Sequence, residues 1–244
     1  MLNRYFQSLY QDAIGRAYET AYGLIAASAG PEALILDCGA HNGRNMDLIL
    51  RRTGLDRKQL HGIEWNESCA DEGRRRGLNI ARGDLNRGIA ADNGQYSCVH
   101  ALSVLEHLLN PCRFLKECRR VLRPGGQLIL LTPNISTYFT AALILAGKMP
   151  SSGPHPDSEA LLAAAAILGE KAGTPPPDVE GDTPVHRHLV VFSYRVLGQY
   201  LRMLDFSGVS GRGFGLYPFP IFMQPPLERL DPWHCHQMVF VATK

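Results

Sequence analysis

The sequence lacks several features that mark particular classes of protein. Its longest apolar run, residues 138–147, is about half as long as a membrane-spanning helix needs to be. Its 25 Lys and Arg residues nearly balance its 23 Asp and Glu residues, so no general excess of positive charge favours nucleic acid. Residues 1–16 contain no apolar core followed by a small-residue cleavage site, which a secretory signal requires. These absences predict a soluble cytoplasmic protein with no nucleic-acid partner and no integral membrane contact.

A disulfide framework and a cysteine-based metal site are also missing. The six cysteines form no C-x-x-C pair, and several fall within apolar runs, so we expect reduced, buried thiols. The segment WHCH (233–236) brings His234 and His236 close in sequence, but we interpret them as alternating residues at the start of a strand. No second pair of ligands lies at a useful spacing, so the sequence predicts no metal site.

What the sequence does contain is an alternation of strand-like and helix-like segments. Continuous apolar runs, as expected for strands buried on both faces of a sheet, recur between segments of helical period. The strands are expected at 33–37, 60–65, 79–85, 96–104, 127–133, 208–214 and 236–244. This order predicts an α/β fold, a doubly wound and mostly parallel seven-stranded sheet with helices on both faces and a reversed final strand.

The alternation breaks after the fifth strand. Residues 134–188 contain an apolar helix, a loop rich in Gly, Pro and Ser, and an alanine-rich segment (158–171) that favours helix. Connections this long usually have a function or are disordered, so we interpret the region as a helical insertion that lies over the sheet. A helix at 192–206 restores the regular pattern.

The stretch LILDCGAHNGR, residues 34–44, is the most informative turn. Gly39 and Gly43 let the backbone turn tightly and approach a ligand, where the amide groups of the next helix begin. A bound pyrophosphate would need the pattern G-x-G-x-x-G, but here His41 fills part of the phosphate space and no P-loop lysine lies near. The turn therefore favours an adenosine ligand that carries little phosphate.

Acidic residues at the ends of three strands support a ligand site. Glu64 ends the second strand about 20 residues after the turn, where a carboxylate can accept hydrogen bonds from both ribose hydroxyls. Asp84, at the exit of the third strand, could accept a hydrogen bond from an adenine amino group. Asp37, at the end of the first strand, can orient the turn and a cationic amine. Each acid alone could equally be a solvated residue at a strand end or a helix cap. Three acids at the ends of three strands favour one shared ligand site.

These residues belong to motifs that resemble a known family. The segments ILDCGAHNG, GIEW, GDL, ALSVLEHLLNP and RRVLRPGGQLILLTPN resemble successive motifs of the class I S-adenosylmethionine-dependent methyltransferases, in particular the small-molecule and quinone-biosynthesis branch. The resemblance covers residues 30–135 and extends more weakly to 186–206. The family usually has a glycine where His41 stands. The resemblance implies a Rossmann-like fold, a transferase activity and S-adenosyl-L-methionine as cofactor.

The resemblance also implies roles for individual residues. Asp37 and the glycine after Cys38 would border the methionine part of the cofactor, and Glu64 would hold the ribose. Asp84 and the leucine that follows it would contact the adenine. The predicted cofactor-binding residues are Asp37, Gly39, Ala40, His41, Gly43, Glu64, Asp84, Leu85 and Ser103, of which the last would line the pocket after the fourth strand.

In this interpretation residues 1–244 form a single methyltransferase domain, as a monomer or a homodimer. Its expected parts are an N-terminal helix (1–30), a cofactor-binding core (31–133), an inserted cap or substrate region (134–188), and a closing helix with strands (189–244).

Catalysis of methyl transfer depends mainly on alignment and exclusion of water, and a general base helps only when the nucleophile arrives protonated. The candidate bases are His107, in VLEHL after the fourth strand, and His186 and His188 beside the insertion. A structural hydrogen bond would explain each of them as well. His100, inside the fourth strand, is expected to be a core residue whose hydrogen bonds are satisfied.

The Asn/Asp-Pro-Pro-aromatic motif of amine- and base-modifying relatives is replaced by ALSVLEH, which disfavours DNA or amide nitrogen as acceptor.

We therefore expect methyl transfer by in-line displacement to a small, apolar or aromatic acceptor, with O-methylation slightly preferred. Residues 138–147 and the proline-spaced aromatic segment 213–227, too irregular for a core helix, would wall the acceptor pocket. A dimer contact or ordinary packing explains that segment equally well.

A non-catalytic S-adenosylmethionine-binding or partner-recruiting protein, with a pocket impaired by His41, stays open as an alternative. An NAD(P)-dependent dehydrogenase is less favoured, because the dinucleotide pattern is missing.

Overall fold

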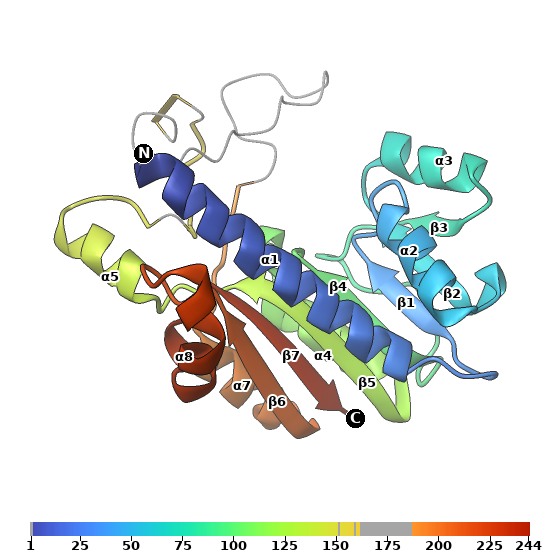
Figure 1. The fold of residues 1–244 in the computed structure, drawn as a ribbon. Helices are drawn as coiled ribbons and strands as arrows, with labels where there is room; N and C mark the ends of the chain where they lie inside the picture. Colours follow the sequence, from blue (N-terminus) through green and yellow to red (C-terminus); the bar gives the residue numbers. More distant parts are fainter. Residues whose placement is uncertain (1, 151, 159, 162–186) are drawn as a thin grey trace.

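A computed structural model of the protein describes residues 2–150, 152–158, 160–161 and 187–244. Its centre is a seven-stranded sheet with the order β3-β2-β1-β4-β5-β7-β6 (Figure 1). The strands are β1 (Ile35–Cys38), β2 (Leu60–Glu64), β3 (Asn79–Arg82), β4 (Tyr96–Leu102), β5 (Leu122–Pro133), β6 (Ser207–Phe214) and β7 (Gln237–Thr243). The first five strands are parallel, and β7 runs antiparallel to both of its neighbours. The doubly wound sheet with a reversed final strand is thus confirmed.

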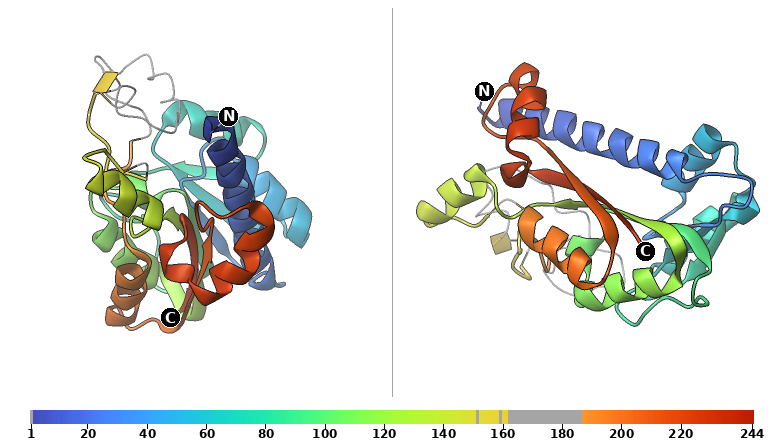
Figure 2. Two further views of the ribbon diagram at one scale, coloured as in Figure 1. Left: turned by 60° about the vertical axis from the view of Figure 1, so that its left-hand side comes forward. Right: turned by 90° about the horizontal axis from the view of Figure 1, so that it is seen from below.

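Helices cover both faces of this sheet. They are α1 (Leu2–Ala27), α2 (Arg44–Thr53), α3 (Glu67–Arg75), α4 (Pro111–Val121), α5 (Tyr138–Leu145), α7 (Tyr194–Met203) and α8 (Gln224–Leu230). Apolar side chains of α1, α2 and α3 pack in one cluster with one face, while those of α4 and α7 pack in a second cluster with the other face. The view from below shows α1 on one side of the strands and α4 with α7 on the opposite side (Figure 2).

Alternation along each strand explains why both clusters are apolar. In β5, Leu128 and Leu130 belong to the α4 and α7 side, whereas Ile129 and Leu131 belong to the α1 side. Successive side chains of a strand point to opposite faces, so a strand covered on both faces needs an uninterrupted apolar run. The sequence pattern that predicted these strands is therefore a direct consequence of the two layers of helices.

Helix α1 crosses the sheet diagonally and packs against β5 and β7 (Figure 1). Leu9, Ala13, Ala17 and Ala21 are fully buried at a spacing of one helical turn. Three alanines in this row allow the helix to lie close to the strands beneath it. The N-terminal helix expected from the sequence is confirmed, with its end at Ala27.

Two features of the C-terminal region differ from the expectations. Residues 213–227 were expected to be too irregular for a core helix, but their last four residues begin the short helix α8 at Gln224. Pro225 and Pro226 occupy its first turn, where a helix leaves amide groups without partners and tolerates proline. His234 and His236 do not alternate along a strand start, because residues Pro232–His234 form a 3-10 turn (η4) and β7 begins only at Gln237.

The region after β5 begins with a short, apolar helix. Thr137 caps α5 by accepting a hydrogen bond from the backbone nitrogen of Thr140 at 2.9 Å. Ile144 and Leu145 are exposed, and α5 extends away from the sheet (Figure 2). Most of the alanine-rich segment 158–171 lies outside the described residues. Within the described ranges, none of the helices combines the length and apolar character needed to cross a membrane.

One ion pair connects the N-terminal helix with the C-terminal region. Arg16 in α1 lies 2.6 Å from the carboxylate of Glu228 in α8, whose side chain is only 6% exposed. The same carboxylate accepts a hydrogen bond from the backbone nitrogen of Gly215 at 2.6 Å. Glu228 therefore fixes both α1 and the chain after β6.

Replacing Glu228 by alanine leaves the backbone nitrogen of Gly215 and the charge of Arg16 without this partner. We expect a loss of about 2 kcal/mol in the free energy of unfolding, measured by urea denaturation. Glu19→Ala is the matched control, since Glu19 pairs with Arg52 on the exposed surface and should matter much less. Equal losses in the two variants would show that the ion pair is not structural.

Candidate cofactor and acceptor site

The turn between β1 and α2 requires glycine at two positions. Gly39 and Gly43 have φ angles of 84° and 81°, in the left-handed region that other residues adopt at a cost. A side chain would also collide with Val104 at the first position and with Leu78 at the second. Conformation and space therefore both select glycine, and Ala40 between them is buried.

His41 occupies the position where the family usually has glycine, and its φ angle is 48°. This left-handed conformation costs a residue with a side chain roughly 1–2 kcal/mol. The imidazole is exposed, and its Nε2 lies 3.4 Å from the Sγ of Cys69 on α3. The backbone keeps the turn that a glycine would allow, while the ring leans towards α3.

The carboxylate of Glu64 joins two loops at the end of β2. One oxygen accepts a hydrogen bond from the backbone nitrogen of His41 at 2.8 Å, and the other accepts one from Asn66 at 2.9 Å. Glu64 is only 6% exposed. Each carboxylate oxygen has two acceptor positions, so both oxygens retain capacity for a hydroxyl donor such as a ribose. The predicted ribose contact remains a prediction, but this positioning role was not foreseen.

Asp37 is a buried acid that pairs with no Lys or Arg among the described residues. Its Oδ1 lies 3.4 Å from Nδ1 of His100, and its Oδ2 has no hydrogen-bond partner among the described residues. Burial, with a contribution from the charge of Glu64, raises the pKa of Asp37 to about 7. A buried carboxylate oxygen without a partner is the feature that a bound cationic group would satisfy.

His100 is fully buried, as expected for a core residue of β4. Burial lowers its pKa to about 3, so the ring is neutral and adds no positive charge beside Asp37. Neither ring nitrogen has a hydrogen-bond partner within the described part of the chain. The expectation that its hydrogen bonds are satisfied is therefore wrong.

The remaining predicted cofactor residues follow β3 and β4. Asp84 is exposed and accepts a hydrogen bond from the backbone nitrogen of Asn86 at 2.9 Å, while Leu85 is buried. Ser103 has a φ angle of 56°, and its hydroxyl accepts a hydrogen bond from Tyr18 at 3.2 Å. The carboxylate of Asp84 thus shapes a local turn, and its predicted contact with adenine remains a prediction.

The sheet places these residues along the carboxyl ends of its parallel strands. Strands β3, β2, β1 and β4 are parallel neighbours, with Cys38 aligned with Ile63 and Glu64 with Arg82. Since parallel strands end on the same side, the residues that follow them share one rim, which is where ligands bind in open α/β sheets. The predicted cofactor-binding residues lie at these four strand ends or in the turns that follow them.

Two polar residues near this rim were missed by the sequence analysis. Glu106, in the 3-10 turn η2 (Leu105–His107), is 2% exposed and accepts a hydrogen bond from Thr132 at 2.9 Å. Burial raises its pKa to about 7. Burial also raises the pKa of Tyr18, with contributions from the charges of Glu106 and Asp37. Tyr18 also reaches from α1 to Ser103, a contact that no local sequence pattern indicates.

Two of the three candidate bases, His107 and His188, lie beside each other after the end of β4. The rings of His107 and His188 are 5.1 Å apart, and His186 lies outside the described residues. Burial lowers the pKa of His107, and it lowers the pKa of His188 to about 3. Both rings are therefore neutral at pH 7, and a pKa this low makes His188 a poor proton acceptor.

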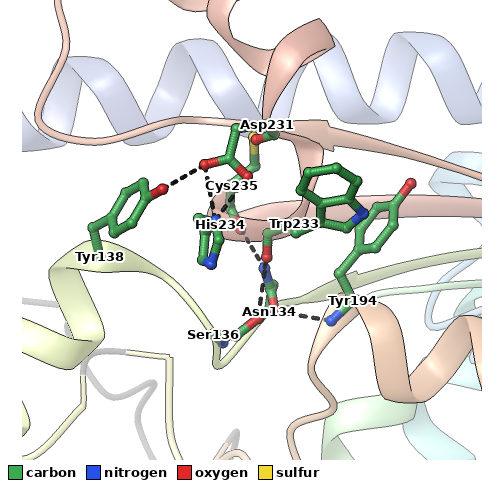
Figure 3. A network of polar contacts seen from close by, with 8 residues as sticks. All are labelled: Asn134, Ser136, Tyr138, Tyr194, Asp231, Trp233, His234 and Cys235. Atoms are coloured by element: carbon green, nitrogen blue, oxygen red, sulfur yellow. Dashed lines mark hydrogen bonds and ion pairs between the residues drawn. The ribbon is translucent and has the colours of Figure 1, made fainter.

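A hydrogen-bond network fixes the chain that leaves β5 (Figure 3). The side-chain nitrogen of Asn134 donates to the backbone oxygens of Trp233 and Cys235, each at 2.8 Å. Its side-chain oxygen accepts from the backbone nitrogen of Tyr194, at the start of α7, at 3.1 Å. Asn134 is fully buried and thereby joins the start of the inserted region to α7 and η4.

The same network attaches α5 to η4. The hydroxyl of Tyr138 donates to Asp231 at 2.7 Å, and Nδ1 of His234 lies 2.7 Å from the same carboxylate (Figure 3). The rings of Tyr138 and His234 stack with centroids 4.4 Å apart. His234 thus has a local structural partner.

The segment 213–227, which was expected to wall the acceptor pocket, is only partly buried. Phe222 is 81% exposed and Phe219 is 37% exposed, so these two rings lie at the surface. The buried aromatic residues of this segment are Phe214 and Tyr217.

Comparisons with known proteins identify the family. A family model described as a methyltransferase domain matches residues 7–210. A probable S-adenosylmethionine-dependent methyltransferase of Mycolicibacterium smegmatis is 31% identical over 128 residues, which cover 50% of this chain and 46% of that protein. The ubiquinone biosynthesis O-methyltransferase of Maricaulis maris is 33% identical over 120 residues, covering 45% and 44%. The chain thus spans less than half the length of these two relatives.

A solved structure from Thermotoga maritima, titled a SAM-dependent methyltransferase and possible histamine N-methyltransferase, resembles the whole fold. The TM-score is 0.57 with 14% sequence identity, and the match covers 99% of this chain and 97% of that one. At this identity the likeness shows the fold alone.

The raised pKa of Asp37 predicts how stability changes with pH. The folded-state pKa is about 7, against 3.8 for an exposed aspartate, so the folded state holds the proton more tightly. Stability should therefore fall as pH rises from about 4 to about 7, and Asp37→Asn should remove this loss, which is up to about 4 kcal/mol. Urea denaturation at pH 5 and pH 8 measures the effect. Glu32→Gln, on the exposed surface, is the control; a difference between wild type and Asp37→Asn that does not change with pH would contradict the assignment.

Proposed function

Because the chain belongs to the class I S-adenosylmethionine-dependent methyltransferases, we propose that it transfers a methyl group from S-adenosyl-L-methionine to a small acceptor. The observation that carries this proposal is the buried carboxylate of Asp37, whose Oδ2 has no partner among the described residues. It lies at the end of β1, beside the glycine turn and Glu64. A cationic, phosphate-poor adenosyl ligand suits this combination, whereas a pyrophosphate would add negative charge next to two acids.

The proposed roles follow from the positions of the residues. Asp37 would face the cationic methionine part, the backbone of Gly39 and Ala40 would border it, and Glu64 would accept hydrogen bonds from the ribose hydroxyls. Asp84 and Leu85 would border the adenine. The remaining members of the predicted set, His41, Gly43 and Ser103, would shape the turn and the pocket wall.

The protein's contribution to the reaction is alignment. The bound cofactor supplies a methyl carbon that is already activated by a sulfonium, so orientation of the acceptor can contribute roughly 7–11 kcal/mol. Tyr18 donates to Ser103 and so holds α1 over the end of β4. Glu64 holds the β1 and β2 loops in fixed relation. These contacts would hold the walls of the proposed site in place while the acceptor is aligned.

We propose an acceptor that is small, apolar or aromatic, and methylated on oxygen. The relative from Maricaulis maris is named an O-methyltransferase, which supports this choice. The apolar helix α5, in the described part of the inserted region, would contact such a molecule. We further propose that residues 1–244 act as one methyltransferase domain, as a monomer or homodimer, with 134–188 as its substrate region.

A non-catalytic cofactor-binding protein is the second candidate, because His41 replaces the family's glycine. The geometry gives this candidate little support. His41 adopts the left-handed conformation that a glycine would adopt, and its ring leans towards Cys69. The side chain therefore need not impair the pocket.

The proposed function predicts which nucleotide binds. In calorimetric titrations, wild type should bind S-adenosyl-L-methionine and should not bind NADH. Asp37→Asn should weaken binding about 10–100-fold, because a hydrogen bond to a charged group is lost, while Glu32→Gln should bind as wild type does. Labelled methyl donor incubated with a cell extract should then label small molecules extractable into organic solvent. Binding of NADH, or equal affinity in Asp37→Asn, would contradict the proposal.

The hydrogen bond from Tyr18 to Ser103 can be tested with a matched pair of tyrosines. Tyr18→Phe should weaken cofactor binding about fivefold, as expected for one neutral hydrogen bond. Tyr5→Phe is the control, since it removes a bond from the N-terminal end of α1, to the backbone oxygen of Pro218 at 2.8 Å. If both variants bind the cofactor equally well, Tyr18 does not contribute to the pocket.

A further inference from the structure

Three side chains near the end of β4 hold potential metal ligands close together. One ligand atom each from Glu106, His107 and His188 lies within 4.8 Å of the other two. Glu106 and His107 are consecutive residues of η2, whereas His188 comes from the segment that follows the insertion. Glu106 is buried and both histidines are half-buried.

Backbone hydrogen bonds hold the two contributing segments against each other. The backbone nitrogen of Leu189 donates to the backbone oxygen of Glu106 at 2.7 Å. On its other side, the backbone oxygen of His188 accepts from His155 at 2.9 Å. The position of His188 beside η2 is therefore fixed by the main chain and does not depend on its ring.

Each of the three side chains is also oriented by a second partner. The Nδ1 of His107 lies 3.1 Å from the backbone oxygen of Arg187, and the Nδ1 of His188 lies 2.6 Å from that of Ser152. A carbonyl oxygen only accepts, so each ring carries its proton on Nδ1 and its lone pair on Nε2. Metal-binding histidines are usually held in this way.

The carboxylate of Glu106 completes the set. Thr132 donates a hydrogen bond to one of its oxygens at 2.9 Å. This bond orients the side chain through one oxygen and does not use the other. Ligating carboxylates are commonly hydrogen-bonded in the same manner. The three groups are thus oriented before any ion arrives.

We propose that Glu106, His107 and His188 bind one divalent transition-metal ion. Two imidazoles and one carboxylate suit Zn²⁺ and neighbouring metals such as Co²⁺, Fe²⁺ and Mn²⁺. Three ligands at about 2.0–2.2 Å from one ion lie about 3.3–3.8 Å apart in tetrahedral or trigonal geometry. The three atoms lie within 4.8 Å of one another, so binding requires the side chains to approach each other by up to about 1–1.5 Å. The sequence predicted no metal site because these ligands come from separate segments.

The position of the ion suggests what it does, and this step rests on the proposed function. Three protein ligands leave coordination positions open, as in catalytic metal sites. Glu106 lies three residues after Ser103, which accepts a hydrogen bond from Tyr18 at the cofactor rim. A hydroxyl of an aromatic acceptor, such as a phenol, would occupy an open position with its oxygen.

Coordination lowers the pKa of that hydroxyl, and its proton passes to water. The oxygen's electron pair then forms the bond to the methyl carbon, while the carbon–sulfur bond breaks and its electron pair stays on sulfur. This assigns the acceptor class as a phenol or a related acidic hydroxyl compound. It also removes the need for His188 to act as a base.

The competing explanation is a purely structural cluster. His155 stacks on His188 with ring centroids 4.8 Å apart, so the histidines also connect the loop after α5 to η2. Metal binding separates the two explanations.

The test titrates the chelator-treated protein with Co²⁺ and Zn²⁺ as probes. We expect one equivalent of each metal by calorimetry and visible ligand-field absorption from the bound cobalt. His188→Gln and Glu106→Gln should each weaken binding about 100-fold or more, since even outer-shell changes cost 10–100-fold. His234→Gln is the matched control, because His234 pairs with Asp231 outside the cluster. Glu106→Gln preserves an acceptor for Thr132, and circular dichroism checks that each variant is folded.

The absence of cobalt binding to the folded wild type, or equal binding in the cluster variants and His234→Gln, overturns the metal site. Titration of S-adenosyl-L-methionine into the same chelated protein tests the proposed function separately. Cobalt binding without cofactor binding would overturn the proposed function and leave the metal site intact. Cofactor binding without cobalt binding would overturn the metal site and leave the proposed function intact.

Discussion

The carboxylate of Glu64 accepts one hydrogen bond from the turn after β1 and another from the turn after β2. These two turns form the rim on which the candidate cofactor site depends. A carboxylate that is nearly buried needs such donors, and the backbone of a tight turn needs such an acceptor. Burial, with a contribution from the charge of Glu64, raises the pKa of the neighbouring Asp37. The site thus has an excess of negative charge that favours a cationic ligand.

Much of the fold could be predicted from the sequence. Strands buried on both faces leave a plain apolar signal, and the turn at Gly39 and Gly43 leaves another, because only glycine fits there. The error at α8 has a specific cause. The prolines of 213–227 suggested an irregular chain, yet Pro225 and Pro226 stand in a first turn, where proline is tolerated.

The candidate site could be predicted only in part. Residues at the ends of parallel strands could be grouped, since the sheet aligns those ends. The contact of Tyr18 with Ser103 and the grouping of Glu106 with His188 join segments far apart in the chain. No local pattern encodes such contacts. His100 shows the same limit, because burial could be inferred from the strand but the absence of hydrogen-bond partners could not.

A crystal structure of the protein with S-adenosylhomocysteine would test the central claim most directly. The account predicts that both ribose hydroxyls lie about 2.5–3.0 Å from the oxygens of Glu64. It also predicts that the bonds from the backbone nitrogens of His41 and Asn66 persist, and that the ligand's amino group meets Oδ2 of Asp37. A ligand bound away from these two carboxylates would contradict it.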